Sequence, residues 1–90
     1  MELEGSVAVV TGGAVRLGRS ISLALADEGA AVFIHYNRSA GPAEALRDEI
    51  IASGGTAAIG PGDLSDPRKA GEIITEATEA LGPVSLLVNS

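Results

Sequence analysis

A chain of 90 residues is long enough for one small domain, and because 46% of its residues are hydrophobic but only 2% are aromatic, its core must be aliphatic. Twelve acidic and six basic residues give a net charge of −6, which argues against a nucleic-acid partner, since phosphates require a basic face. The sequence has no cysteine and a single histidine, His35, which excludes disulfides and most zinc sites, and we expect no metal site.

The N-terminal segment, residues 1–10, lacks the basic region of a signal peptide, and its apolar run is far too short to span a membrane. We therefore expect a cytoplasmic protein without a membrane partner. Within this segment, residues 6–10, SVAVV, are apolar at consecutive positions after the serine. This pattern predicts a strand that is buried on both faces.

The segment 18–28 predicts a helix, and it is followed by Gly29, a favourable residue for ending a helix. Its expected apolar face consists of Leu17, Ile21, Ala24 and Leu25. Residues 30–36, AAVFIHY, predict a second buried strand. A second helix is expected over residues 42–53, with Pro42 in its first turn and two glycines directly after it.

Residues 56–65 predict a weaker third strand that runs into a loop. The pair Asp66–Pro67 is then typical of a helix start, with Asp66 as the cap. The apolar face of this third helix is expected to comprise Ala70, Ile73, Ile74, Ala77 and Leu81. The pair Gly82–Pro83 ends the helix, and residues 84–88, VSLLV, predict a fourth strand.

Strands and helices are therefore expected to alternate in the order β-α-β-α-β-α-β. Because right-handed crossovers join consecutive strands, this order predicts an α/β fold: a Rossmann-type, doubly wound parallel sheet in three αβα layers, with strand order 3-2-1-4. The fourth strand would form a bare apolar sheet edge, which invites aggregation. We therefore expect an incomplete sheet, in which residues 1–90 are the first half of a larger domain.

The stretch VVTGGAVRLG, residues 9–18, joins the first strand to the first helix. At such a junction the free N–H groups and the positive dipole end of the helix favour an anion. Gly12 permits a sharp exit from the strand, and Gly18 lets a diphosphate approach the helix without an intervening Cβ. A tight turn without a ligand is the alternative, but the position between strand and helix favours phosphate binding.

The same stretch read from Thr11 to Gly18, TGGAVRLG, resembles the TGxxxGxG pattern of the short-chain dehydrogenase/reductase family, with Arg16 in place of the middle glycine. Together with HYNRS, residues 35–39, the variant TGxxxRLG looks most like the pteridine reductase-like members of that family. The resemblance extends over all 90 residues and implies a cofactor site that includes Leu17 beside Arg16 and Gly18.

Further cofactor contacts are implied after the third and fourth strands. Asp63 and Leu64 stand where the family contacts adenine, and Asn89 follows the fourth strand. The family pattern at the latter place is Asn-Asn-Ala-Gly or Asn-Asn-Ala-Ser, whereas this sequence reads Asn89-Ser90. Asp63 has a second interpretation of similar weight, because it can cap a turn with its neighbour Ser65.

Two interpretations are open for Arg16. The resemblance implies that this side chain lies over the cofactor phosphates and faces the substrate pocket, where it adds a fixed positive charge to the turn. Otherwise it is an exposed arginine at the start of a helix, where a cation is unfavourable to the helix dipole. Because a neighbouring anion would remove that penalty, we favour the phosphate role.

The residues after the second strand bear on the choice between NADP and NAD. Many NAD-binding folds place a carboxylate there to hold the ribose 2′-hydroxyl. The corresponding segment here consists of Tyr36, Asn37, Arg38 and Ser39, and the next acid is Glu44. Arg38 can form a charge-assisted fork with a 2′-phosphate, and Ser39 can donate a hydrogen bond. An ordinary polar loop is the alternative, but we expect NADP(H) as the cofactor.

Members of this family transfer a hydride to or from a carbonyl or imine-like bond and use a Tyr-x-x-x-Lys pair. Tyr36 and Lys69 do not have that spacing, and His35 is expected to pack or to bond the backbone rather than to act as an acid or base. We therefore assign no catalytic residue to this chain.

The resemblance implies that the full-length protein is an NADPH-dependent homo-tetramer acting on a small carbonyl or pteridine-like substrate. The alternatives are a non-catalytic NADP(H)-binding or sensing module, and an interaction protein that kept the fold and lost the ligand.

Overall fold

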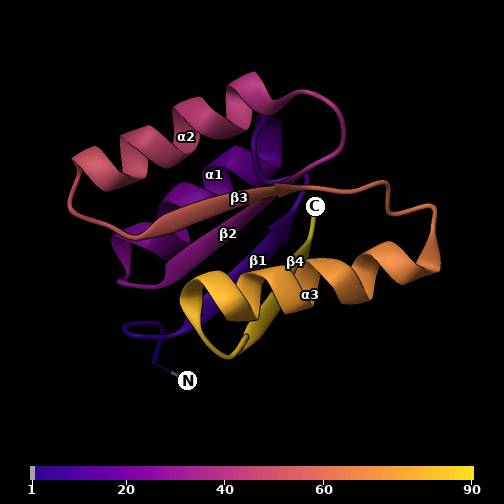
Figure 1. The fold of residues 1–90 in the computed structure, drawn as a ribbon. Coiled ribbons are helices and arrows are strands. Elements are labelled where there is room, and N and C mark those ends of the chain that lie inside the picture. Colours follow the sequence, from indigo (N-terminus) through magenta and orange to yellow (C-terminus); the bar gives the residue numbers. More distant parts are fainter. Residues whose placement is uncertain (1) are drawn as a thin grey trace.

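Strands and helices alternate along residues 2–90, the part of the chain that the computed structural model describes (Figure 1). In chain order the elements are β1 (Val7–Thr11), α1 (Arg16–Asp27), β2 (Ala31–Tyr36), α2 (Ala40–Ala52), β3 (Ala57–Pro61), α3 (Pro67–Leu81) and β4 (Leu86–Asn89). This order confirms the expected β-α-β-α-β-α-β arrangement, and the boundaries lie within two residues of most expected ones.

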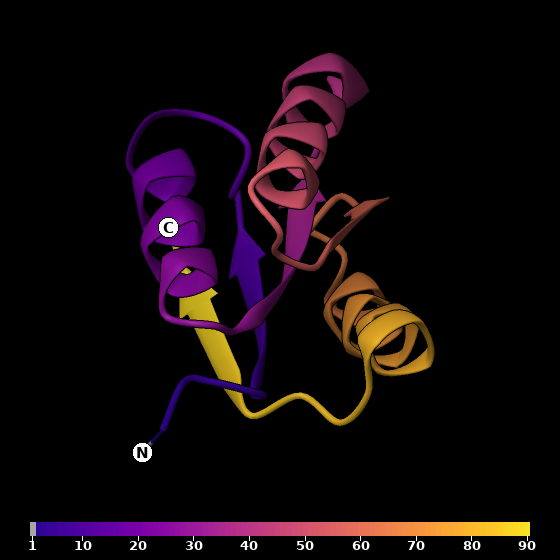
Figure 2. The same cartoon turned by 90° about the vertical axis from the view of Figure 1, so that its left-hand side faces the viewer.

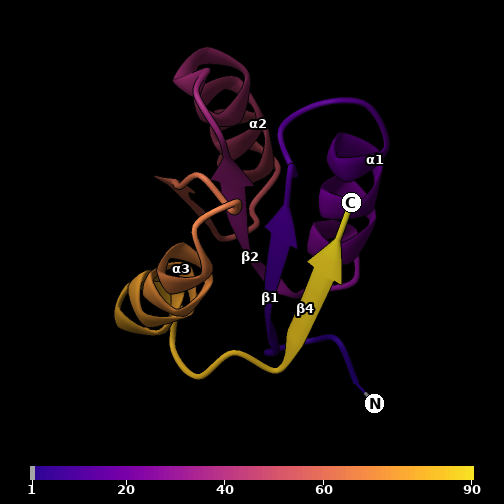
Figure 3. The ribbon, with the colours of Figure 1, turned by 90° about the vertical axis from the view of Figure 1, so that its right-hand side faces the viewer.

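The four strands form one parallel sheet in the order β3-β2-β1-β4, as expected from right-handed crossovers. The arrowheads of β1, β2 and β4 accordingly point the same way in Figure 3. Val9 marks the centre of the sheet, since it pairs with Phe33 of β2 on one side and with Leu87 of β4 on the other. All four carboxyl ends therefore meet at one edge of the sheet.

Helices cover both faces of the sheet, which gives the three expected layers. Helices α1 and α2 lie on one face and α3 lies on the other (Figures 1 and 2). The apolar cluster under α1 and α2 includes Val10, Ile34 and Leu46, whereas Val9 packs under α3 in a second cluster. Because neighbours along a strand point to opposite faces, consecutive apolar residues in β1 supply both clusters.

The fourth strand differs from the central strands in its burial. Every residue of β1 is buried, whereas β4 alternates between half-buried and exposed positions. Leu87 is 51% exposed on the outer strand, while Val88 packs against the cluster under α1 and α2. The apolar sheet edge expected from the sequence is therefore present among the described residues.

The expected apolar face of the first helix is wrong in part. Leu17 is 68% exposed and Ala24 is also exposed, whereas the buried positions of α1 are Gly18 and Ser22. The helix lies so close to the end of β1 that small residues fill this contact, and Ile21 is only half-buried beside them. The periodicity therefore located the helix but not the residues at its closest approach.

The start of α3 agrees with its expected capping signal. The Asp66 side chain accepts a hydrogen bond of 3.0 Å from the Arg68 backbone N–H, and Pro67 is the first helical residue. The apolar face also agrees at Ile73 and Ala77, which are buried, but Ala70 is exposed. The sequence thus placed this helix and most of its packing face.

Candidate functional site

Two clefts lie where the strands end, and seven of the eleven expected site residues line them. One cleft, of about 410 Å³, is lined by Gly12, Ala14, Val15, His35, Tyr36, Asn37, Arg38, Ser39 and Pro42. We call it the β2 cleft. The other, of about 390 Å³, is lined by Thr11, Leu64, Asn89 and residues of α3 and β4, and we call it the β4 cleft. Ligands of open α/β sheets bind outside the carboxyl ends of the strands, which is where both clefts lie.

The turn from β1 into α1 brings the helix start against the strand end. Gly12 has φ +60°, a left-handed conformation that glycine adopts without strain. A Cβ on Gly18 would lie 2.1 Å from the Gly12 carbonyl oxygen, so position 18 has no room for a side chain. These two glycines bring the first turn of α1 directly over the end of β1.

The N-terminus of α1 has an open set of hydrogen-bond donors. Its cap residue is Val15, whose side chain cannot accept a hydrogen bond, and the first turn contains no acidic residue. The first N–H groups of a helix have no partner within it, so those after Val15 remain available to an anion. The helix dipole adds a partial positive charge at the same end.

Arg16 begins this helix with an unusual backbone. Its φ is +53°, in the left-handed region that costs a non-glycine residue roughly 1–2 kcal/mol. The TGxxxGxG pattern has glycine at this position, and the conformation gives a physical reason for that preference. Arg16 and Leu17 are exposed and line neither cleft; they are the first residues of α1, directly after Val15 of the β2 cleft.

The basic side chains divide into two groups within residues 2–90. Four of the six form ion pairs with carboxylates: Arg19 with Glu49, Arg47 with Asp48, Arg68 with Asp66, and Lys69 with Glu72. The remaining two, Arg16 and Arg38, have no carboxylate partner in the part of the chain that the structure describes. These are the two arginines that the sequence predicts beside cofactor phosphates.

The end of β2 passes directly into the start of α2. Ser39 is the cap residue of α2, yet its side chain forms no capping hydrogen bond, and the first turn of the helix has no acid. Arg38 and Ser39 are both exposed at the mouth of the β2 cleft. A second helix N-terminus with free donors therefore opens at this edge, beside an unpaired arginine.

No carboxylate lines the β2 cleft, although twelve acids are present in the chain. Its polar side chains are those of His35, Tyr36, Asn37, Arg38 and Ser39, all from one segment. The cleft is therefore suited to an anion, in contrast to the acidic remainder of the surface.

His35 is buried, with 4% of its surface exposed, and both of its ring nitrogens bond the backbone. Nδ1 lies 3.0 Å from the Gly12 nitrogen and Nε2 lies 2.7 Å from the Gly62 carbonyl oxygen. The expectation of a backbone-bonding histidine is thus confirmed. His35 is not among the predicted cofactor residues, because a single sequence does not show which loops a strand residue contacts.

Two further residues at the turn were missed. A Cβ on Gly13 would lie 2.8 Å from the Val10 carbonyl oxygen, so this position also requires glycine. The fully buried Ser22 donates a hydrogen bond of 3.2 Å to the Gly13 carbonyl. The available signal was the four-residue spacing from Gly18 to Ser22, which places both on one helix face.

Asp63 caps the loop after β3. Its Oδ1 accepts hydrogen bonds from the Ser65 hydroxyl at 2.7 Å and from the Ser65 backbone N–H at 2.9 Å. These bonds lower the pKa of the Asp63 carboxyl below its ordinary value, with the hydroxyl as the larger cause. The expected turn with Ser65 is therefore present, and the adenine contact stays a prediction. The neighbouring Leu64, 38% exposed, lines the β4 cleft.

The ends of β1 and β4 are joined through Thr11. Its hydroxyl lies 3.2 Å from Asn89 Oδ1 and 3.3 Å from the Val88 carbonyl oxygen, and it can donate to either. The Thr11 hydroxyl oxygen also accepts a hydrogen bond of 3.3 Å from the Ser90 backbone N–H. Asn89 is thereby held beside the turn, as the last residue of β4 and not, as expected, the first residue after that strand.

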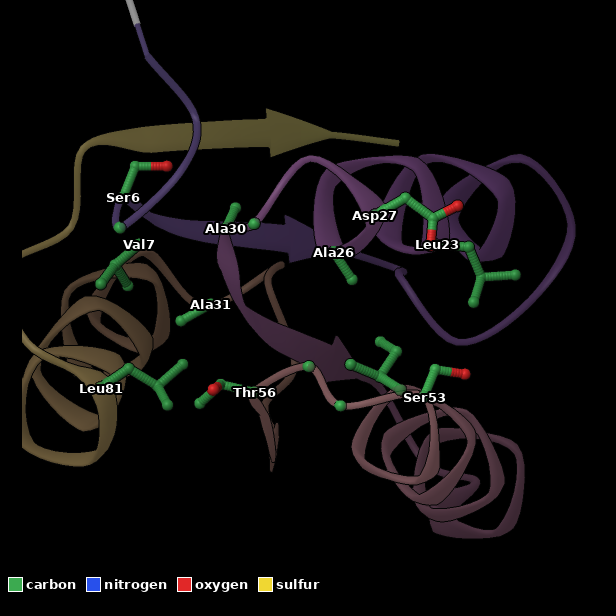
Figure 4. Close-up of a pocket in the computed structure, with 15 residues that line it drawn as sticks. Ser6, Val7, Leu23, Ala26, Asp27, Ala30, Ala31, Ser53, Thr56 and Leu81 are labelled. Carbon is green, nitrogen blue, oxygen red and sulfur yellow. The ribbon is translucent and has the colours of Figure 1, made fainter.

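A third cleft, of about 370 Å³, lies at the opposite edge of the sheet (Figure 4). It is bordered by Ser6 and Ala30 near the strand starts and by Asp27 and Ser53 at the helix ends. The negative dipole ends of α1 and α2 and the Asp27 carboxylate all disfavour an anion there. The edge where the carboxyl ends of the strands meet, which we call the carboxyl edge, is therefore the better phosphate site.

Neither a metal-binding cluster nor a membrane-spanning helix is found among residues 2–90. No group of three or more histidine, aspartate or glutamate side chains in this range could hold a metal ion. Over the same range, every helix is too short or too polar to cross a membrane.

Comparison with known proteins agrees with this arrangement. The short chain dehydrogenase family matches residues 6–90. L-rhamnose 1-dehydrogenase (NAD(P)(+)) from a Sphingomonas species is 38% identical over 88 residues, which are 98% of this chain and 35% of that protein. The chain therefore spans about a third of the length of such relatives.

Solved structures show the same likeness. FolM alternative dihydrofolate reductase 1 from Brucella canis, complexed with NADP, has a TM-score of 0.87 and 38% identity, over 97% of this chain and 35% of that one. A dehydrogenase/reductase from Sinorhizobium meliloti has a TM-score of 0.93 and 40% identity, over 99% and 36%.

A pair of glycine substitutions tests the close approach of α1 to β1. Gly18→Ala should destabilise the protein by about 1–3 kcal/mol, because the new methyl group collides with backbone. Gly71→Ala, within α3 and with no atom outside the neighbouring helix backbone within 4 Å of the new Cβ, should stabilise it by roughly 0.5–1 kcal/mol. Urea unfolding of both variants measures the difference, and equal effects would contradict the packing described.

The lowered pKa of Asp63 can be measured directly. Ser65→Ala removes the hydroxyl donor, so the Asp63 pKa should rise toward its ordinary value in an NMR carboxyl titration. A folded-state pKa below the unfolded one stabilises the fold above the unfolded pKa, and this stabilisation is lost as pH falls through the folded pKa. The variant should therefore lose less stability on acidification than wild type. An unchanged Asp63 titration would exclude the contact with the Ser65 hydroxyl.

Proposed function

Because the chain belongs to the short chain dehydrogenase family, we propose that the protein containing it is an NADPH-dependent oxidoreductase. Its reaction would be hydride transfer to a carbonyl or pteridine-like substrate. Residues 1–90 would be the N-terminal dinucleotide-binding half of its Rossmann-type domain. Since the chain spans about a third of its relatives, the activity is proposed for the whole protein.

The pair of arginines without carboxylate partners carries this proposal. In a chain of net charge −6, four bases are paired, whereas Arg16 and Arg38 stand free within residues 2–90. Each lies at a helix start that has no capping side chain bond and no acid in its first turn. Two positive centres at two open helix ends match a ligand that carries phosphate at two separate places.

The first phosphate position would be the start of α1. The N–H groups after Val15 and the Arg16 guanidinium would hold the diphosphate, while Gly18 lets the helix start lie directly against the end of β1. The charge also accounts for tolerance of the left-handed Arg16 backbone, because a glycine would avoid the strain but supply no cation.

The second phosphate position would be the start of α2. Arg38 and the Ser39 hydroxyl would bind the ribose 2′-phosphate, with Tyr36 and Asn37 lining the same β2 cleft. A carboxylate would repel this group, and none lines the cleft. We therefore propose NADP(H) rather than NAD(H) as the preferred cofactor.

The remaining contacts concern the adenine and the end of β4. Asp63 keeps one oxygen outside its turn with Ser65, and that oxygen would accept from the adenine amino group. Leu64 would supply an apolar contact, and Asn89 would border the cofactor at the other cleft. When bound, NADPH supplies the hydride; the part of this chain is to bind and orient it.

Two of the relatives described above support the proposed cofactor and substrate class. The Brucella canis structure, which is 38% identical, is an NADP complex of an alternative dihydrofolate reductase. Its substrate class supports a pteridine-like ring, whereas the L-rhamnose dehydrogenase supports a hydroxyl or carbonyl substrate. A homo-tetramer in the cytoplasm is also proposed, on the family resemblance.

A non-catalytic NADP(H)-binding or sensing module is the alternative. It is favoured by one feature of residues 1–90: the site residues predicted there are all cofactor contacts, and Tyr36 and Lys69 lack the spacing of a catalytic pair. NADPH consumption with a carbonyl or dihydropteridine substrate separates the two functions, because a sensing module would bind NADPH without turning it over.

Arg38→Asp tests the 2′-phosphate contact. The substitution removes an attractive charge and adds a repulsive one, so the Kd for NADPH should rise on the order of a hundredfold, while that for NADH changes little. Fluorescence titration of the reduced nicotinamide measures both constants. Arg47→Asp makes the same charge change farther along α2, outside the β2 cleft, and should leave both constants nearly unchanged. Equal losses for NADPH and NADH in Arg38→Asp would refute the assignment.

Arg16→Gly tests the diphosphate contact. NADPH and NADH share the diphosphate, so both Kd values should rise by a similar factor, about tenfold. Stability should be retained, because glycine accepts a φ of +53°. The same titrations, with thermal unfolding beside them, give the answer. A loss confined to NADPH would assign Arg16 to the 2′-phosphate instead.

A further inference from the structure

We infer that His35, as a neutral ring protonated at Nε2, positions the phosphate-binding turn by accepting the Gly12 backbone N–H at Nδ1. This role deepens the proposed function, on which it rests, by adding a positioning residue to the cofactor site. His35 lies near the end of β2, in register with Gly60 of β3. Its ring is thus held between the turn after β1 and the loop after β3.

The hydrogen bonds fix the form of the ring. The Gly12 nitrogen is a donor, so the Nδ1 atom 3.0 Å away must carry a lone pair. The Gly62 carbonyl is an acceptor, so Nε2, 2.7 Å away, must carry the proton. One ring nitrogen accepts and the other donates, and only the neutral Nε2–H tautomer does both. A ring protonated at Nδ1 would turn two donors toward each other.

Residue 35 also holds the next amide of the turn. The Gly13 N–H donates to the His35 carbonyl oxygen at 3.1 Å. Two consecutive N–H groups of the turn are therefore directed toward one residue of β2 and away from a ligand. The donors left for a phosphate are those that follow, at the start of α1. His35 thus determines which part of the glycine turn faces the anion.

The same ring joins the two ends of the proposed cofactor site. Gly62, which accepts from Nε2, immediately precedes Asp63, and its own N–H donates to the Tyr36 carbonyl at 3.1 Å. The ring therefore links the phosphate turn to the loop proposed to bind adenine. With the ring removed, the Gly12 N–H would lose its partner in a part-buried setting, where an unpaired donor is unfavourable.

Three substitutions separate the two contacts. In His35→Asn the shorter amide reaches the place of Nδ1 and can accept from Gly12, whereas in His35→Gln the longer amide reaches the place of Nε2 and can donate to Gly62. His35→Leu removes both contacts. Each variant of the whole protein is examined for thermal unfolding, for Kd of NADPH and NADH, and for amide hydrogen exchange at Gly12.

The positioning role predicts a specific order. His35→Leu should raise the Kd values for NADPH and NADH about tenfold to a hundredfold, since the turn binds the diphosphate that both nucleotides contain. His35→Asn should restore affinity to within about threefold of wild type and keep Gly12 protected from exchange. His35→Gln should resemble His35→Leu in nucleotide affinity and in Gly12 exchange, even if its unfolding temperature matches that of His35→Asn. A merely structural histidine would give losses that follow stability alone.

Equal affinities and equal Gly12 exchange in all three variants would overturn the inference. Failure of the proposed function has a different signature, because wild type would then bind neither nucleotide. In that case the exchange rates at Gly12 still decide the inference: protection in wild type and His35→Asn, with loss in His35→Gln, supports it, and uniform rates overturn it.

Discussion

The close approach of α1 to the end of β1 is the contact on which the rest of the site depends. At the nearest point the position of a Gly18 Cβ would fall 2.1 Å from the Gly12 carbonyl oxygen, so the two backbones meet with no side chain between them. Ser22, one turn further on, is fully buried and bonds the Gly13 carbonyl. This contact sets the open N-terminus of α1 over the sheet edge, and the free donors of that N-terminus are what an anion would meet.

Electrostatics then distinguishes this edge from the rest of an acidic molecule. Ion pairs engage the other bases, while Arg16 and Arg38 lie at two helix starts whose first turns contain no acid. The opposite edge carries the carboxyl ends of the same helices and Asp27. Clefts of similar volume are present at both edges, so size does not select the site; the direction of the helix dipoles and the free charges do.

The element order and the strand order could be predicted, because apolar runs, turn residues and handedness rules act locally or on the whole topology. The same topology brings most of the predicted site residues to the carboxyl ends of the strands, while their contacts with a cofactor stay a prediction. The packing face of α1 could not, since hydrophobic periodicity favours large apolar residues whereas the close contact selected Gly18 and Ser22. The roles of Gly13 and His35 depend on what lies across neighbouring strands, which one sequence does not record. For Asp63 two roles were open, and the turn with Ser65 is the one that needs no ligand to be seen.

The most direct test of phosphate binding at the carboxyl edge is an amide NMR titration with NADPH. Binding as described should perturb the amides of residues 14–18 and 38–41, at the starts of α1 and α2, and leave residues 53–56 at the opposite edge unchanged. Perturbations confined to the opposite edge, or none at the two helix starts at saturating NADPH, would contradict phosphate binding at the carboxyl edge.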